Sequence, residues 1–120
     1  MNDQRVTSSH ALSRARISLR GLRAGVRRDR ALRELWIGLG LGWLALALLG
    51  TEPLWWAVTA VVSATALAIE HLNTAVETLL DRLHPDEHPE IGAAKDLTSG
   101  AAFICNVAAG LVMVGAAIAG

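Results

Sequence analysis

Three apolar stretches separated by polar segments define the pattern of this 120-residue chain. They cover about residues 34–51, 54–81 and 97–119. The first is slightly short of the roughly 20 residues that a helix needs to cross a bilayer, and the second is long enough to cross and protrude. Tryptophans lie on both sides of the turn between the first two stretches, as is typical of a membrane interface. The pattern predicts an all-α integral membrane protein of a single domain with three transmembrane helices.

The segment 11–33 has a different, amphipathic periodicity. One stripe of apolar residues steps by three and four, and a stripe of arginines lies beside it: Leu12, Ala15, Leu19, Leu22 and Val26, then Arg16, Arg20, Arg23, Arg27 and Arg30. Such a helix is expected to lie in the plane of the membrane surface, with its cations among lipid headgroups. A solvent-exposed face rich in arginine is the alternative.

Charge is distributed unevenly, although the net charge is zero. Residues 1–34 contain nine Arg and three acidic residues, whereas residues 35–120 contain Arg82, Lys95 and eight acidic residues. The first segment is therefore expected to meet an anionic surface, and the apolar stretches favour lipid over nucleic acid. A polar loop is expected over 82–95, because Pro85 and Pro89 break a helix. Because basic segments stay in the cytoplasm, the N-terminus and this loop are expected on that side, with the Glu52 turn and the C-terminus outside. The ionisable groups are then expected to meet at one interface.

Neither the N-terminal sequence nor the cysteine content is typical of a secreted protein. The N-terminus lacks a short apolar core before a small-residue cleavage site, so we expect no signal peptide. The single Cys105 lies in an apolar run and is expected to act as a small hydrophobic side chain.

An acidic stripe interrupts the second apolar stretch. At about 100° per residue, four polar side chains fall within roughly 80° of one another: Glu70, Asn73, Glu77 and Asp81. A charged residue at the centre of a spanning helix costs on the order of 2.5–3.5 kcal/mol, so the stripe calls for a function. It begins roughly 24 Å along a helix from Leu54, near the end of the span. It indicates a site for cations and charged groups at the membrane surface, the alternative being a polar seam that joins helices.

The residue types suit phosphoryl transfer. Carboxylates and an amide can bind Mg²⁺ while phosphates fill its other positions. A free carboxylate can orient or deprotonate a hydroxyl, and Lys95 and arginines can neutralise phosphate. The chain has no GxxxxGK[ST], HRD or DFG segment, so a kinase of this sequence belongs to neither common class. His84 and His88 have no helical i, i+4 frame, and we expect surface histidines rather than metal ligands.

Two motifs together resemble a known family. EHLNTAVETLLDRL (70–83) is followed by AAKDLTSGAA (93–102), with the Lys-Asp pair fourteen residues after Asp81. This order is similar to that of the small prokaryotic diacylglycerol kinases and their undecaprenol kinase relatives, over roughly residues 13–115. SLRGLRA (18–24) resembles the surface helix of that family.

The resemblance implies a homotrimer of three-span protomers in the bacterial inner (cytoplasmic) membrane, with active sites shared between subunits and facing the cytoplasm. It implies transfer of the γ-phosphate of ATP to diacylglycerol or undecaprenol, with Mg²⁺ as cofactor. The implied roles are as follows: Glu70 as the catalytic group on the lipid hydroxyl, Glu77 and Asp29 as metal ligands, Glu77, Asp86, Glu87, His88, Lys95 and Asp96 on the nucleotide, Asn73 and Asp81 in support, and Ser99 near the lipid.

The chain departs from the family pattern in its first segment. Asp29 stands where the family usually has Glu, and Ile17 where some relatives have Tyr. A Gln/Glu pair common at the start of the first span reads Glu34-Leu35, and an N-terminal basic residue falls at His10 or Arg14. The acceptor stays open between the two lipids.

Two other classes of function compete with the kinase. A small proton-coupled transporter would use an intramembrane carboxylate such as Glu70. A membrane assembly protein would use the stripe only to hold helices together. Consumption of ATP that depends on added lipid separates the kinase from both.

Overall fold

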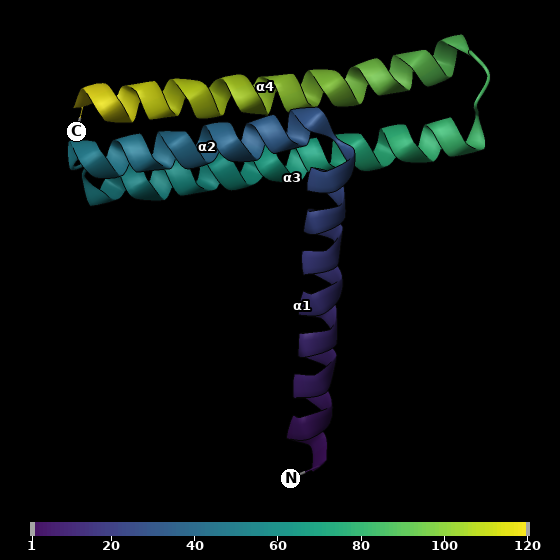
Figure 1. Cartoon of the computed structure of the whole chain (residues 1–120), viewed down its shortest axis with the longest axis horizontal. Coiled ribbons are helices and arrows are strands. Elements are labelled where there is room, and N and C mark those ends of the chain that lie inside the picture. Colours follow the sequence, from purple (N-terminus) through teal and green to yellow (C-terminus); the bar gives the residue numbers. More distant parts are fainter. Residues whose placement is uncertain (1, 120) are drawn as a thin grey trace.

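Four helices make up the part of the chain that the computed structural model describes, the backbone of residues 2–119 and the side chains of residues 7–119. They are α1 (Asn2–Arg28), α2 (Arg30–Leu49), α3 (Pro53–Leu83) and α4 (Pro89–Ala119). Helices α2, α3 and α4 lie along one another, and α1 leaves this stack near its middle (Figure 1). The molecule is flat, 53 × 49 × 20 Å. The all-α prediction is confirmed, and three helices are long and apolar enough to cross a membrane.

The expectation of one helix over 11–33 is wrong at both ends. Helix α1 begins at Asn2 and ends at Arg28, and α2 begins directly after Asp29. Asp29 has an extended backbone (φ −116°, ψ 121°), and its carboxylate accepts a hydrogen bond from Ala31 N as the N-cap of α2. Arg33 Nη1 donates to the last carbonyls of α1, those of Val26 and Arg27, at 3.0 and 3.1 Å. These contacts hold a sharp bend between α1 and α2 at Asp29, which we call the elbow.

The polar loop expected over 82–95 is also shorter. Helix α3 continues to Leu83, and α4 begins at Pro89. Proline lacks an N–H, but the first turn of a helix leaves that group unpaired in any case, so Pro89 starts a helix instead of breaking one. Lys95 and Asp96 therefore lie in the early turns of α4 and not in a loop.

Buried residues recur with a seven-residue repeat in each long helix. Helix α2 buries Leu32, Leu39 and Leu46, helix α4 buries Ala102, Ala109 and Ala116, and helix α3 buries Thr59, Ser63, Ala66, Glu70 and Asn73 at spacings of four and three. This repeat is that of helices packed at a shallow angle, and small residues allow close approach. Leu39, Ala66 and Ala109 form the centre of the core. The polar residues of α3 therefore occupy the same face as its packing seam.

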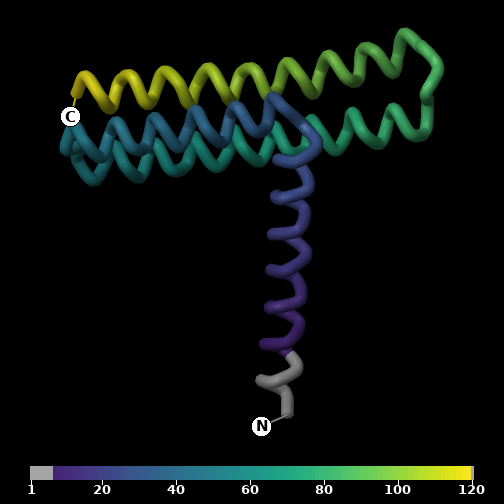
Figure 2. Tube along the Cα trace, in the orientation of Figure 1, coloured from purple at the N-terminus to yellow at the C-terminus, as the bar shows by residue number. Residues whose placement is uncertain are grey.

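The turn between α2 and α3 is held by its own side chains. Gly50 ends α2 with φ of 71°, a left-handed conformation that favours glycine. Thr51 Oγ1 donates to Leu46 O at 2.8 Å, and Trp56 Nε1 donates to Thr51 O at 3.0 Å. Figure 2 shows this turn at the same end of the stack as the C-terminus, opposite the α3–α4 loop.

Length differences place the ends of α3 and α4 beyond the elbow. The 20 residues of α2 span about 30 Å, whereas the 31 residues of α3 span about 46 Å. The two longer helices accordingly continue past the point where α1 departs (Figure 1). Glu70 lies about 26 Å from the start of α3 and Glu77 about 36 Å, which brackets the edge of a hydrocarbon core about 30 Å thick.

Candidate functional site

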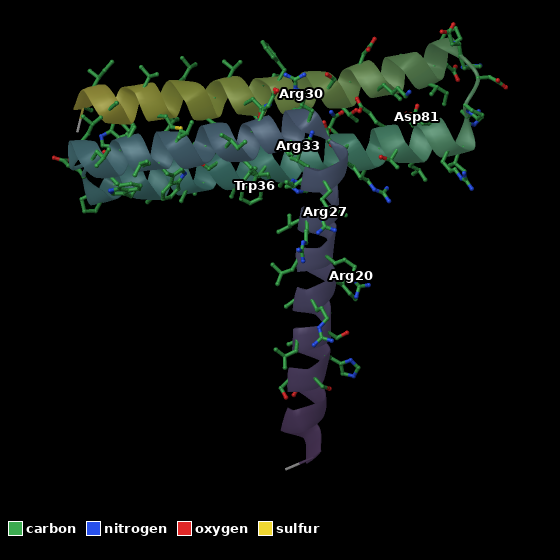
Figure 3. All side chains as sticks on the ribbon, in the orientation of Figure 1. Arg20, Arg27, Arg30, Arg33, Trp36 and Asp81 are labelled. Carbon is green, nitrogen blue, oxygen red and sulfur yellow. The ribbon has the colours of Figure 1, made fainter. Side chains whose placement is uncertain are left out.

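The acidic stripe of α3 passes from buried to exposed along the helix. Glu70 and Asn73 are 6% and 7% exposed, Glu77 is half-buried, and Asp81 is exposed. Asp81 lies on the part of α3 that extends beyond the elbow (Figure 3). The stripe thus runs from the packing seam between the helices, at Glu70 and Asn73, to the exposed surface at Asp81.

Glu70 is held from the opposite helix. Asn106 of α4 donates from Nδ2 to Glu70 Oε2 at 3.0 Å. The Oδ1 atoms of Asn73 and Asn106 are both covered and have no hydrogen-bond partner. A buried carbonyl without a donor costs about 1–3 kcal/mol, so each of these two amides is held at a cost to stability.

Asp29 reaches the same stretch of α3. Its Oδ1 accepts from Ala31 N at 2.9 Å, and its Oδ2 accepts from Thr74 Oγ1 at 2.6 Å. Thr74 lies between Glu70 and Glu77, and its hydroxyl is also 3.1 Å from Glu70 O. The elbow therefore carries the predicted metal ligand Asp29 to the middle of the stripe. Thr74 was not among the residues expected from the sequence.

Lys95 and Asp96 lie on different faces of α4. Lys95 forms an ion pair with Asp81 of α3. It lies seven residues before Ala102, so it continues the buried repeat of α4. Asp96 instead lines an open groove of 830 Å³ with Leu97, Gly100 and neighbouring residues. Ser99 is exposed and stands seven residues before Asn106. Within this chain, Lys95 but not Asp96 is therefore joined to the acidic stripe.

The loop residues predicted to bind nucleotide share a cavity of 560 Å³ at the exposed end of the stripe. Asp81, Asp86, Glu87, His88 and Lys95 all line it. His88 Nδ1 accepts from Glu90 N at 3.2 Å, which ties the loop to the start of α4. Acidic groups outnumber the single lysine here, so a polyphosphate would enter this cavity only with a cation to screen it.

Among the described residues, no three His, Cys, Asp or Glu side chains are grouped so that they could hold a metal ion. Mg²⁺, however, is commonly held by one or two carboxylates with phosphates and water. Asp29 uses one acceptor position on each oxygen, and a carboxylate offers about four. Asp29 and Glu77 therefore fit the donor set of a nucleotide-bound Mg²⁺.

The arginines of α1 take no part in the stripe. Arg20 and Arg27 lie along α1, outside the stack of α2, α3 and α4 (Figure 3). Arg28 and Arg82 line a separate cavity of 450 Å³ between α1 and α3, together with Thr74 and His71. His71 also meets the ring of Trp36 edge-on, with centroids 6.2 Å apart. The expectation that all ionisable groups meet at one interface is therefore wrong for the exposed part of α1.

Comparison with known proteins gives the family. The family described as "Prokaryotic diacylglycerol kinase" matches residues 16–118. A diacylglycerol kinase of Haemophilus influenzae is 32% identical over 110 residues, which covers 89% of this chain and 91% of that protein. The match confirms the resemblance that the two sequence motifs indicated. The chain belongs to the prokaryotic diacylglycerol kinase family, and with it to the ATP-dependent lipid kinases.

Proposed function

We propose that this protein transfers the γ-phosphate of ATP to the primary hydroxyl of a membrane lipid alcohol, with Mg²⁺, at the cytoplasmic surface of the bacterial inner membrane. The observation that carries the proposal is Glu70, a buried carboxylate at the edge of the apolar layer with one oxygen hydrogen-bonded by Asn106. Diacylglycerol and undecaprenol share the required hydroxyl, and the relative named above is a diacylglycerol kinase.

Glu70 is the group proposed to act on the acceptor. Its depth lets it meet a hydroxyl that stays among the lipid headgroups, while its partner Asn106 keeps the carboxylate oriented. A carboxylate in hydrogen-bond reach of an alcohol removes or directs its proton as the oxygen attacks phosphorus. Asn73 lies three residues further along α3, and its covered amide is proposed to support the site around Glu70.

Mg²⁺ would supply charge neutralisation and orientation of the phosphates when bound. Glu77 and Asp29 would hold it, because Glu77 belongs to the α3 stripe and Asp29 reaches the same stretch of α3 through its hydrogen bond with Thr74. Lys95 would bind phosphate oxygens, and Asp81, its partner in the ion pair, would position it. Asp86, Glu87 and His88 would contact the rest of the nucleotide from the cavity that they share with Lys95.

A homotrimer with shared sites would complete this arrangement. Asp96 faces an open, mostly apolar groove on the side of α4 away from Lys95, and Ser99 is exposed nearby. A neighbouring protomer seated against that face would bring its own stripe toward Asp96 and Ser99. The arginines of α1 would keep the N-terminus and the site in the cytoplasm.

Phosphate transfer from labelled ATP tests the proposal. Purified protein in lipid vesicles receives diacylglycerol or undecaprenol with Mg²⁺, and the labelled lipid is separated and counted. We expect product with at least one acceptor, and loss of product in Glu70→Gln although the variant keeps its helical content and assembly state. A folded wild-type protein that labels neither lipid would refute the proposal, and uptake assays in vesicles would then test the transporter.

A further inference from the structure

Asn106 is a polar side chain in the apolar part of α4 to which the sequence motifs give no role. It lies in the middle of α4, next to Cys105, which packs against the core. Its amide crosses to α3 and donates to Glu70 Oε2 at 3.0 Å. This bond joins positions 36 residues apart and is the contact through which α4 reaches the proposed catalytic group.

The two oxygens of Glu70 are placed differently. Oε2 is bound to Asn106, whereas Oε1 has no hydrogen bond to any described residue. Glu70 Oε1 is not fully covered. It is therefore partly accessible, although the whole residue is only 6% exposed. One oxygen is fixed and the other is free to receive a proton or a hydroxyl.

We propose that Asn106 is a positioning residue that orients Glu70 for the acceptor hydroxyl, an inference that rests on the function proposed above. A glutamate side chain has three rotatable torsions, and a hydrogen bond to one carboxylate oxygen limits the directions in which the other oxygen can point. A bond to an ionised carboxylate is also stronger than one between neutral groups. Asn106 thus keeps Oε1 directed outward without covering it.

The geometry argues against a role in stability alone. Asn106 Oδ1 is covered and unpaired, and a buried unsatisfied carbonyl opposes folding. A leucine of similar size would remove that unpaired carbonyl, but it would leave Glu70 Oε2 without its donor. The amide is therefore better explained by what its Nδ2 does for Glu70 than by packing between α3 and α4.

Kinetics of Asn106→Leu and Asn106→Gln test the assignment. Loss of the donor in Asn106→Leu should lower kcat about 10- to 100-fold, the effect of one misdirected catalytic hydrogen bond, while KM for ATP and for lipid stay within about twofold. Asn106→Gln keeps the donor and should retain more of the kcat than the Leu variant. Cys105→Ala, which alters packing on the same turn of α4, is the matched control and should keep wild-type kcat.

Several results would overturn the inference. They are wild-type kcat in Asn106→Leu, equal losses in the Leu and Gln variants, or a loss of similar size in Cys105→Ala. If Asn106→Leu fails to accumulate in membranes, Asn106→Ser and Asn106→Ala give the same comparison with a smaller change of shape. The Ser variant should then be faster than the Ala variant by about three- to tenfold, and equal rates would refute the role. Wild-type protein that transfers no phosphate would instead reject the proposed function.

Discussion

The hydrogen bond between Thr74 and Asp29 is expected to hold the elbow against α3. Thr74 Oγ1 donates to Asp29 Oδ2 at 2.6 Å, a short bond to a charged acceptor. Such bonds contribute about 1.5–3 kcal/mol, and partial exposure of both residues lowers this to about 1–2 kcal/mol here. Thr74→Val keeps the shape of the side chain and removes the donor. We therefore expect it to lower the free energy of unfolding by about 1–2 kcal/mol.

A double-mutant cycle isolates this bond from the other role of Asp29. Asp29→Ala also removes the N-cap of α2, which costs about 0.5–2 kcal/mol by itself. That cost is present whether or not Thr74 is intact, so it cancels in the cycle and leaves a coupling energy of about 1–2 kcal/mol. Unfolding in mixed detergent micelles, followed by tryptophan fluorescence, supplies the four free energies.

Thr78→Val is the matched control. Thr78 lies one turn further along α3, is exposed, and donates only within its own helix, to Thr74 O at 2.7 Å. Its replacement should change the free energy of unfolding by no more than about 0.5 kcal/mol. A coupling energy below about 0.3 kcal/mol, or an equal cost for Thr78→Val and Thr74→Val, would show that the bond does not hold the elbow.

Three further changes test other parts of the fold and site. Gly25→Ala should destabilise the protein by about 1–3 kcal/mol, because its Cβ would meet side-chain atoms of Leu32 and His71 at 2.8 and 3.1 Å. Gly21→Ala lies in open space on the same helix and should stabilise the protein by up to about 1 kcal/mol in the same unfolding assay. Equal effects of the two alanines would contradict this packing. Lys95→Met should raise KM for ATP while hardly moving the unfolding midpoint, because its ion pair with Asp81 is exposed to water; a large loss of stability would assign it a structural role. Glu77→Gln should raise the Mg²⁺ concentration for half-maximal activity by about tenfold or more, and an unchanged Mg²⁺ curve would exclude it as a ligand.

Hydrophobic periodicity was sufficient for the spanning helices, because length and apolarity alone decide which segments can cross a bilayer. It failed at the ends. Asp29 reads as one residue of an amphipathic repeat, and only its capping chemistry explains why α1 stops at Arg28. Pro89 is both a helix breaker and a good first residue, and the sequence does not decide which.

Contacts across the α3–α4 pair were beyond the sequence pattern. The face shared by Glu70, Asn73 and Glu77 follows from helical spacing, but the partner of Glu70 depends on the register of an antiparallel helix that begins at Pro89. Asn106 could be recognised in the sequence as an amide in an apolar run, but the sequence does not identify the residue that it contacts. Lys95 and Asp96 are adjacent in sequence and belong to one motif, yet the helix turns them toward different faces.

The short α3–α4 connection has a consequence for how the chain enters the membrane. Only residues 84–88 separate the two helices, and the hydrogen bond between Asn106 and Glu70 lies within this pair. A charged group facing acyl chains costs on the order of 2.5–3.5 kcal/mol on insertion scales. Paired as a hairpin, α3 and α4 shield one another's polar groups from lipid at the moment of insertion. The contact proposed to orient Glu70 would thus also lower the cost of inserting this carboxylate into the membrane.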